Sequence, residues 1–389
     1  MEALFWVSLF GAIYSYAIYP LILHVATLIS SKQQNLASED QLAEKISAIS
    51  KWPRISHIIT AHNEQLRIEG KIKNSLAIDY PSVQQEIIVA SDCSSDETDE
   101  IVKKYIEQGV RLVRADEHNG KEYAQYLAIQ AASGDILVFS DTSTSVPADS
   151  FKKLIAEFLD PEVGAVSSED RFITDEGQVA GEGAYVRYEM WLRKLESGLA
   201  GLVGLSGSFF AARKEICAED WDIKSPSDFN TALNCSKLGY KAVSSNQVQG
   251  FYRDVKDSKK EYQRKVRTVI RGITSISRHP AALNIFESGF FGFQVWSHKI
   301  MRWAVPWFLV LLLITNIALI GSGVLYNVSM LGQFLGYGAI AAAWVKPSLQ
   351  NITPIKLGLF FIQVNLAIAH ATISFFRGNR MTVWTPSKR

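Results

Sequence analysis

Hydrophobic and polar residues are segregated along this chain: one apolar stretch opens it, a long polar region follows, and apolar stretches return near the end. Between Glu2 and Lys32, His24 is the only Asp, Glu, Lys, Arg or His side chain. The stretch Trp303–Val345 has none, and Leu357–Phe376 has only His370. A membrane span needs about 20 apolar residues, so the second stretch is long enough for two helices and we predict four spans.

The four predicted spans include one turn between neighbouring spans and one N-terminal anchor. We place the turn between the second and third spans at the polar, glycine-containing patch from Tyr326 to Gln333. The first span is interpreted as a retained anchor and not a cleaved signal peptide. It lacks a basic region before it and has no clear small-residue cleavage site before Lys32.

The distribution of basic residues predicts the orientation in the membrane, because positive charge favours the cytoplasmic side. The basic residues that follow the first span or precede the second are Lys32, Lys45, Lys51, Arg54, Arg264, Lys265, Arg267, Arg271, Arg278, Lys299 and Arg302. We therefore predict a multi-pass protein of the inner (plasma) membrane with a cytoplasmic central region. Four spans would return the C-terminal tail to the outside, although it carries Arg377, Arg380, Lys388 and Arg389. Either a later segment is re-entrant or the tail departs from the rule.

The central region has the pattern of an α/β domain. Short apolar runs end in polar residues and alternate with helical patterns, which is typical of βαβ units around a parallel sheet. The runs are His57–Thr60, Glu86–Asp92, Val110–Ala115, Asp135–Asp141 and Val163–Ser168. One helix is predicted to start at Ser94, because Ser94 and Glu97 have capping-box spacing.

Polar clusters fall at the predicted carboxyl ends of these strands, where ligands bind in open α/β sheets. They are Thr60–Glu64, Ser91–Asp96, Asn119–Lys121 and Asp141–Ser143. A single cluster could equally be a turn or a cap. Two carboxylates, a lysine and helix N-termini on one edge favour a site for a phosphate-bearing ligand with a divalent cation. Neither GxGxxG after the first strand nor GxxxxGK[ST] occurs, which argues against a dinucleotide oxidoreductase and a P-loop NTPase.

Composition narrows the function classes only slightly. A net charge of +1 argues against a strongly basic nucleic-acid binder, so no nucleic-acid partner is predicted. Cys93, Cys217 and Cys235 have neither metal-ligand spacing nor the even count of a disulfide framework, and they fit a reducing compartment.

From about Ile55 to Arg302 the chain resembles the membrane-bound family 2 glycosyltransferases, the group that includes cellulose, chitin and hyaluronan synthases. The resemblance lies in Thr60-Ala-His-Asn-Glu64, Asp79-Tyr-Pro81 and Glu86-Ile-Ile-Val-Ala-Ser-Asp92-Cys-Ser-Ser-Asp96-Glu-Thr98. It implies a GT-A fold: a Rossmann-like, mixed and mostly parallel sheet, here flanked by transmembrane helices. It also implies a nucleotide-sugar donor, with uracil as the first expected base, and Mg²⁺ or Mn²⁺ as cofactor. The residues expected to bind the nucleotide sugar are Asn63, Glu64, Asp92, Lys121 and Asp141.

The triplet Asp141-Thr142-Ser143 stands where the family has its metal-binding Asp-x-Asp. Its second carboxylate is missing. A hydroxyl can still orient a metal-bound water, and Mg²⁺ commonly uses one or two carboxylates together with substrate phosphates. Asp141 and Ser143 are therefore the predicted metal residues.

Two further segments resemble the family's catalytic and acceptor motifs. Ser227-Asp228 is similar to its Asp-Asp or Glu-Asp motif, so Asp228 is the predicted catalytic base. The chemistry requires a carboxylate within hydrogen-bond reach of the acceptor hydroxyl. Ser206 and Gly207, within Gly204–Ser208, resemble the glycine-rich segment near the acceptor, the alternative being a simple turn before an apolar strand.

Gln263, Arg264 and Arg267 resemble the Gln-x-x-Arg-Trp motif of processive synthases, with Thr268 in place of Trp. The arginines are expected to hold the diphosphate leaving group, since guanidinium groups suit phosphate oxygens. The alternative is a basic helix attracted to anionic lipid. An aromatic face that predicts an interfacial helix follows at Phe286, Phe290, Phe293 and Trp296.

The predicted organisation is a transmembrane helix at 1–31, a linker at 32–54, a cytoplasmic glycosyltransferase domain at 55–280, an interfacial helix region at 281–302, about three transmembrane helices at 303–376, and a basic tail at 377–389. The resemblance implies an inverting glycosyltransferase that moves a sugar from a nucleotide sugar to a membrane-associated glycan or lipid-linked acceptor, in exopolysaccharide or capsule synthesis. Two alternatives remain open: transfer of one sugar to a polyprenyl-phosphate-linked acceptor without polymerisation, and a non-catalytic membrane scaffold.

Overall fold

The computed structural model describes residues 1–30, 39–173, 184–253 and 258–381, and it divides into two compact units. The sheet unit comprises Leu23–Lys256, Thr274–Gln294 and Met381–Arg389, and the helical unit comprises Met1–Ile22, Asp257–Ile273 and Val295–Arg380. Residues 31–38 of the predicted linker and 382–389 of the predicted tail lie outside the described residues.

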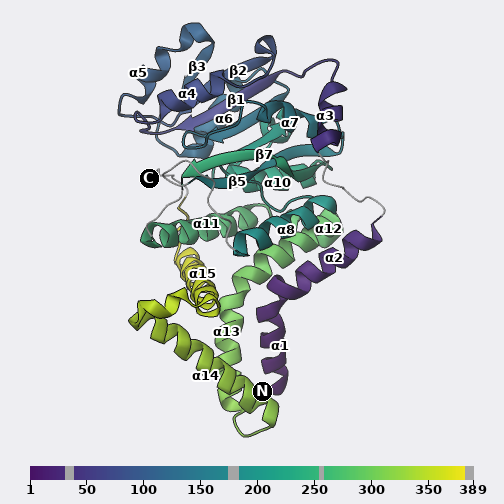
Figure 1. The fold of residues 1–389 in the computed structure, drawn as a ribbon, viewed down its shortest axis with the longest axis vertical. Helices are drawn as coiled ribbons and strands as arrows, with labels where there is room; N and C mark the ends of the chain where they lie inside the picture. Colours follow the sequence, from purple (N-terminus) through teal and green to yellow (C-terminus); the bar gives the residue numbers. More distant parts are fainter. Residues whose placement is uncertain (31–38, 174–183, 254–257, 382–389) are drawn as a thin grey trace. The chain divides into compact units, whose positions relative to one another are not determined.

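A seven-stranded sheet with the order β3-β2-β1-β4-β6-β5-β7 forms the core of the sheet unit (Figure 1). The strands are β1 (Ile55–Ala61), β2 (Gln85–Ser91), β3 (Val110–Arg114), β4 (Ile136–Asp141), β5 (Val163–Ile173), β6 (Phe209–Arg213) and β7 (Lys241–Arg253). β1 is parallel to β2 and β4, β2 to β3, and β5 to β7. Only β6 is antiparallel to its neighbours, β4 and β5. The mixed, mostly parallel sheet that the sequence predicts is thereby confirmed.

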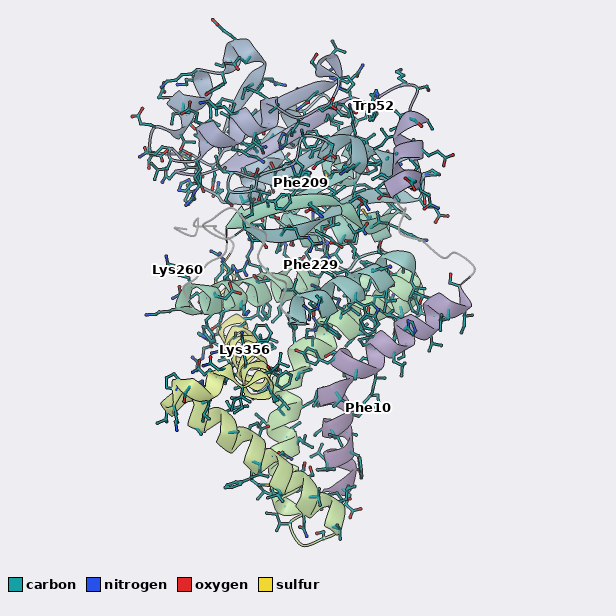
Figure 2. The ribbon with its side chains drawn as sticks, viewed as in Figure 1. Phe10, Trp52, Phe209, Phe229, Lys260 and Lys356 are labelled. Atoms are coloured by element: carbon teal, nitrogen blue, oxygen red, sulfur yellow. The ribbon has the colours of Figure 1, made fainter. Side chains whose placement is uncertain are left out.

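Helices cover both faces of this sheet. Those of the sheet unit are α3 (Glu39–Ser47), α4 (Ile68–Leu76), α5 (Thr98–Lys103), α6 (Lys121–Ala131), α7 (Ser150–Glu157), α8 (Ala184–Gly198), α9 (Lys214–Ala218), α10 (Ser227–Lys237) and α12 (Ile285–Val295). Successive residues of a strand point to opposite faces, so Ile58 packs in the core on the α6 side while Ile59 packs under α4. Phe209, labelled in Figure 2, is fully buried with Phe151 of α7.

The helix predicted to start at Ser94 does not begin there, and that prediction is wrong. α5 begins at Thr98. The Ser94 hydroxyl instead accepts hydrogen bonds from the Asn63 main-chain N–H (3.2 Å) and the Ser91 hydroxyl (3.1 Å). The capping-type side chain is therefore used to join the ends of β1 and β2.

Among the described residues, four helices are long and apolar enough to cross a membrane, the number expected from the hydropathy pattern. They span Glu2–Ile29, Ile285–Ala318, Val324–Val345 and Thr353–Phe376. The first runs through α1 (Glu2–Ile13), a π-helical turn and α2 (Tyr19–Ile29). The others contain α13 (Met301–Ala318), α14 (Val324–Val345) and α15 (Thr353–Phe376). α12, the predicted interfacial helix, bends at Gly289 and continues through a π-helical turn into α13. Its interfacial position stays a prediction.

The turn predicted at Tyr326–Gln333 is also wrong, because these residues lie inside α14. The chain turns earlier, around Gly321, which has the positive φ of 82° that suits glycine. The polar residues of the patch serve a different purpose: the Ser329 hydroxyl and the side-chain amide of Asn316 on α13 are 3.0 Å apart. Such hydrogen bonds join apolar helices to each other.

Candidate active site

The candidate site lies where β4 ends and β6 begins. Because β6 is antiparallel to β4, the segment Gly204–Ser208 before β6 reaches the edge at which β4 ends. The Asp141 main-chain N–H donates to the Ser208 carbonyl oxygen at 2.9 Å. The predicted donor-binding and acceptor-binding segments are therefore adjacent at this edge.

Lys121, the first residue of α6, connects the predicted metal residue Asp141 to the predicted acceptor-side loop. Its Nζ donates to Asp141 Oδ1 (2.5 Å) and to the Gly207 carbonyl oxygen (2.9 Å). A Cβ built on Gly207 would lie 3.4 Å from Asp228 Oδ2, which places the Asp228 carboxylate beside the same loop. Burial alone would lower the pKa of Lys121, but the negative charges of Asp141, Glu122 and Asp228 raise it. Its ammonium is therefore charged at neutral pH.

Asp228 belongs to the first turn of α10, and its main chain also supports the acceptor-side loop. Its carbonyl oxygen accepts from the Leu205 main-chain N–H at 3.3 Å. Ser206 is buried, and its N–H donates to the Ser167 hydroxyl at 2.7 Å. Arg193 of α8 donates to the same hydroxyl (2.7 Å) and to the Gly204 carbonyl (3.0 Å). The loop is held from both sides.

Asp170 is a carboxylate of this site that the sequence analysis missed. It accepts hydrogen bonds from the hydroxyls of Ser206 (2.6 Å) and Ser208 (2.5 Å). Burial raises the pKa of Asp170, with a further contribution from the negative charge of Asp141, against the opposing effect of these hydrogen bonds and of Arg193. The predicted strand ended at Ser168, whereas β5 continues past Asp170. The acidic pair Glu169-Asp170, directly beyond the predicted strand, was the available signal.

Lys71 of α4 is a second residue that the sequence analysis missed. It is 4% exposed, and its Nζ donates to the Thr144 carbonyl oxygen at 2.7 Å. Burial lowers its pKa to about 7, although the charge of Asp141 acts in the opposite direction. Asn74, one turn further along α4, exchanges two hydrogen bonds with the Val146 main chain (2.9 and 3.0 Å). α4 therefore fixes the segment that follows Asp141, and a lysine on the apolar face of this helix was the signal.

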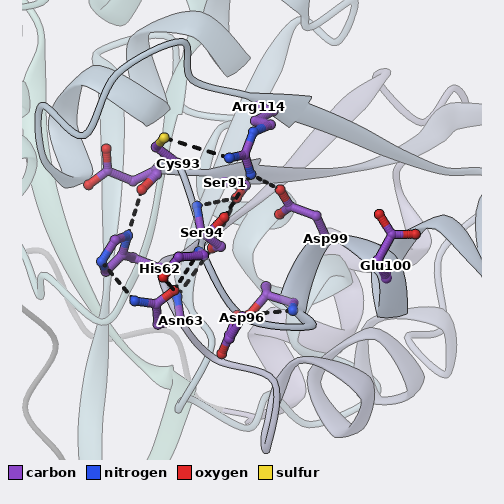
Figure 3. Close-up of polar contacts among 12 residues, drawn as sticks. His62, Asn63, Ser91, Cys93, Ser94, Asp96, Asp99, Glu100 and Arg114 are labelled. Carbon is purple, nitrogen blue, oxygen red and sulfur yellow. Dashed lines mark hydrogen bonds and ion pairs between the residues drawn. The ribbon is translucent and has the colours of Figure 1, made fainter.

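The predicted nucleotide residues at the ends of β1 and β2 form a second cluster (Figure 3). Asn63 and Cys93 both have a φ of 53°, so each strand turns sharply after its last residue. His62 Nδ1 lies 2.6 Å from the Asp92 carbonyl oxygen, and Asn63 Oδ1 accepts from the Ser95 N–H at 2.8 Å. Asn63 and Asp92 are thus brought together as expected at the edge of the sheet.

The Asp92 side chain is fully buried and links this cluster to α6. Its Oδ1 accepts from the main-chain N–H groups of Asn119 and Gly120, both at 3.2 Å. Its Oδ2 lies 2.9 Å from His118 Nδ1, although their geometry is not that of a hydrogen bond and no other described residue donates to it. The β2 end and the segment leading to Lys121 are therefore rigidly connected.

His62, Asp92 and His118 could hold a metal ion, since one ligand atom from each lies within 4.8 Å of the others. The two imidazole rings are stacked, with centroids 4.1 Å apart. Because the rings are nearly parallel, with 19° between their planes, their in-plane nitrogen lone pairs do not converge on one ion in this arrangement. Asp141 and Ser143 do not belong to this group and stay the predicted metal residues.

Of the remaining predicted residues, Glu64 and Arg264 have ion-pair partners of their own. Glu64 is buried, and its carboxylate accepts from Arg67 at 2.9 Å. Gln263, Arg264 and Arg267 lie on α11 (Ser258–Arg278), within the part assigned to the helical unit. The Arg264 guanidinium binds both carboxylate oxygens of Glu261, at 2.8 and 2.9 Å. Roles toward the nucleotide or its diphosphate stay predictions for all four residues.

Residues 56–220 match the family model described as Glycosyl transferase family 2. The chain contains a glycosyltransferase family 2 domain. Poly-beta-1,6-N-acetyl-D-glucosamine synthase of Staphylococcus aureus (strain COL) is 31% identical over 175 residues, which are 43% of this chain and 42% of that protein. The protein of the same name from Staphylococcus epidermidis is 24% identical over 214 residues, 52% of this chain and 51% of that protein. The matches thus span about half the length of these relatives.

Among solved structures, the family 2 domain and its flanking helices are similar to a mannosyltransferase from Pyrobaculum calidifontis, in complex with GDP-Man and Mn²⁺. The TM-score is 0.70 at 21% identity, and the match covers 96% of this chain and 98% of that chain. This similarity shows a shared fold and agrees with the GT-A fold that the motifs predict.

Proposed function

We propose that this glycosyltransferase moves a sugar from a nucleotide sugar to an acceptor hydroxyl at the membrane, with inversion at the anomeric carbon. The observation that carries the proposal is the arrangement around Lys121: its ammonium contacts Asp141 and Gly207, and Asp228 lies beside Gly207. A fixed cation, a possible metal ligand and a candidate base thus meet at one edge of a family 2 domain.

Asp228 acts as the general base in this proposal. It takes the proton of the acceptor hydroxyl as that oxygen bonds to the anomeric carbon. The bond from this carbon to the donor phosphate breaks in the same step, and its electron pair leaves with the nucleoside diphosphate. A single displacement needs no second carboxylate as nucleophile, so the configuration inverts. Lys121 holds a diphosphate oxygen and stabilises the charge that develops on it.

The residues at the end of β4 fit a divalent cation with modest protein ligation. The Asp141 side chain is 30% exposed, and the Ser143 hydroxyl follows two residues later. Mg²⁺ and similar cations are commonly held by one or two carboxylates together with substrate phosphates and water. When bound, Mg²⁺ or Mn²⁺ would neutralise charge on the departing diphosphate.

The donor is proposed to be a UDP-sugar, and UDP-N-acetylglucosamine is the first to test because the relatives are named for an N-acetylglucosamine polymer. The acceptor is proposed to be a membrane-associated glycan in exopolysaccharide or capsule synthesis, used from the cytoplasmic side of the plasma membrane. Thr268, in place of the motif's Trp, favours a second candidate: transfer of one sugar to a polyprenyl-phosphate-linked acceptor. An aromatic platform for a growing glycan is missing at that position.

The test is nucleoside diphosphate release by the purified protein in lipid nanodiscs, across a panel of UDP- and GDP-sugars with Mg²⁺ or Mn²⁺. Asp228→Asn is expected to lower turnover by about 10²–10⁴-fold, the usual contribution of a general base. Asp220→Asn is the matched control, because Asp220 pairs with the exposed Lys237. A ladder of long products indicates polymerisation, and one added sugar indicates single transfer. Absence of turnover with every donor, even with membrane extract as acceptor source, would favour a non-catalytic scaffold.

A further inference from the structure

We propose that Lys121 and the divalent cation compete for Asp141, so that the cation binds tightly only together with the donor diphosphate. This inference rests on the proposed function, because it concerns the metal-binding role of Asp141. It adds an order to the site: the diphosphate must draw the Lys121 ammonium away before Asp141 can act as a metal ligand.

The first argument is the position of the ammonium. Lys121 Nζ lies 2.5 Å from Asp141 Oδ1, and its second contact, 2.9 Å to the Gly207 carbonyl, holds it from the other side. The Lys121 side chain is 11% exposed, whereas that of Asp141 is 30% exposed. Mg²⁺ binds oxygen ligands at about 2.0–2.1 Å. A cation on Asp141 would therefore meet the positive charge of Lys121 within a few ångströms, and the two repel each other.

The second argument concerns the number of negative charges that the Asp141–Ser143 triplet offers to a metal ion. The triplet Asp141-Thr142-Ser143 offers one carboxylate, which a single ammonium can neutralise. A second carboxylate at position 143 would leave one negative charge for the metal even with Lys121 in place. The loss of that carboxylate thus makes the site unusually sensitive to Lys121.

The third argument concerns the oxygen atoms of the donor diphosphate, which can bind both the Lys121 ammonium and the cation. Lysine carries a compact charge on a flexible stem, so its ammonium can exchange a carboxylate oxygen for a phosphate oxygen at little cost. The exchange frees Asp141, and the phosphates add oxygen ligands for the cation. Cation and diphosphate then each strengthen the binding of the other, by the same factor in both directions.

The test measures Mn²⁺ binding, from the loss of the free Mn²⁺ EPR signal, with the full-length protein in lipid nanodiscs and without any sugar acceptor. UDP and GDP serve as diphosphate probes. In the wild type, the better-binding nucleotide is expected to tighten Mn²⁺ binding about tenfold or more, within the usual range for coupled sites. Lys121→Met is expected to tighten Mn²⁺ binding about tenfold without nucleotide and to reduce the effect of the nucleotide.

Lys152→Met is the matched control, because Lys152 makes a comparable ion pair with Asp79 (2.6 Å) away from the site. It is expected to leave both Mn²⁺ affinities unchanged. The proposal is overturned if Lys121→Met binds Mn²⁺ no more tightly than the wild type without nucleotide. Should that variant not fold, the wild type still decides: equal Mn²⁺ affinity with and without both nucleotides also overturns it.

Failure of this inference is distinguishable from failure of the proposed function. Turnover that depends on Asp228, without coupling between Mn²⁺ and nucleotide, refutes the competition and leaves the transferase activity intact. Tighter Mn²⁺ binding by Lys121→Met without nucleotide, together with no turnover from any donor, supports the competition and refutes the activity.

Discussion

Replacing Lys71 with methionine should flatten the pH dependence of the free energy of unfolding between pH 6 and pH 9. Burial lowers the pKa of Lys71 to about 7 in the folded protein, against the opposing effect of Asp141. In the unfolded chain an ordinary lysine has a pKa of about 10.4. Between these two values the unfolded state binds more protons than the folded state, so Lys71 makes stability rise with pH. Below pH 6 both states are protonated and its contribution is constant.

The size of the effect follows from these two pKa values. One group that titrates at about 7 when folded changes the free energy of unfolding by about 2–3 kcal/mol between pH 6 and pH 9, at about 1.4 kcal/mol per pH unit. Methionine removes this dependence. It also leaves the Thr144 carbonyl without the hydrogen bond from the Lys71 amino group, a loss of about 1–3 kcal/mol. Relative to the wild type, the variant should therefore gain about 2–3 kcal/mol as the pH falls from 9 to 6.

The assay is thermal unfolding of the purified protein in detergent, followed by tryptophan fluorescence at four pH values from 6 to 9. Lys73→Met is the control, because Lys73 lies on the same helix but is exposed and paired with Glu69. Its melting curve should shift with pH in parallel with the wild type. If Lys71→Met and the wild type also give parallel curves, Lys71 titrates as an ordinary lysine and the reasoning fails.

Three further predictions concern packing, the acceptor-side loop and the metal ligands. Gly134→Ala places a Cβ 2.5 Å from the Ser56 main-chain nitrogen, so it should lower the free energy of unfolding by about 1–3 kcal/mol in the same assay. Gly70→Ala should not lower it, because no described atom lies within 4 Å of the added Cβ, and equal losses in the two variants would contradict this reasoning. Arg193→Lys loses the guanidinium that donates to the Gly204 carbonyl and to the Ser167 hydroxyl. Because hydrogen bonds from a charged group contribute about 1.5–3 kcal/mol, kcat/KM should fall about tenfold or more. Unchanged kinetics would refute a positioning role for Arg193. Ser143→Asp should tighten Mn²⁺ binding about tenfold by EPR, as a second carboxylate joins Asp141; an unchanged affinity would place position 143 away from the ion.

The framework of the sheet could be predicted because its strands have simple sequences. β1 is buried along its whole length and β4 nearly so, which leaves short, mostly apolar runs that end in polar residues. The residues at these ends, including Asn63, Asp92 and Asp141, were therefore found from sequence alone. Their grouping on one edge follows from the parallel strand order.

What could not be predicted depends on contacts between distant segments. Asp170 gains its place in the site from Ser206, 36 residues away, and no local pattern records that hydrogen bond. Ser94 has the spacing of a helix cap, but its hydroxyl is engaged by Asn63 from the neighbouring strand end. The polar residues of α14 suggested a turn, whereas Ser329 bonds to Asn316 of the adjacent helix. In each case a tertiary partner overrides the local signal.

The reversed direction of β6 has a consequence for how this enzyme can diverge. The chain reaches the site edge forward along β1, β2 and β4, but it enters the same edge backward, through the segment Gly204–Ser208. Insertions or exchanges between α8 and β6 would reshape the loop before β6 without moving the ends of the three parallel strands. The segment before β6 can therefore vary as a separate module, and under the proposed function this would separate acceptor preference from binding of the nucleotide sugar.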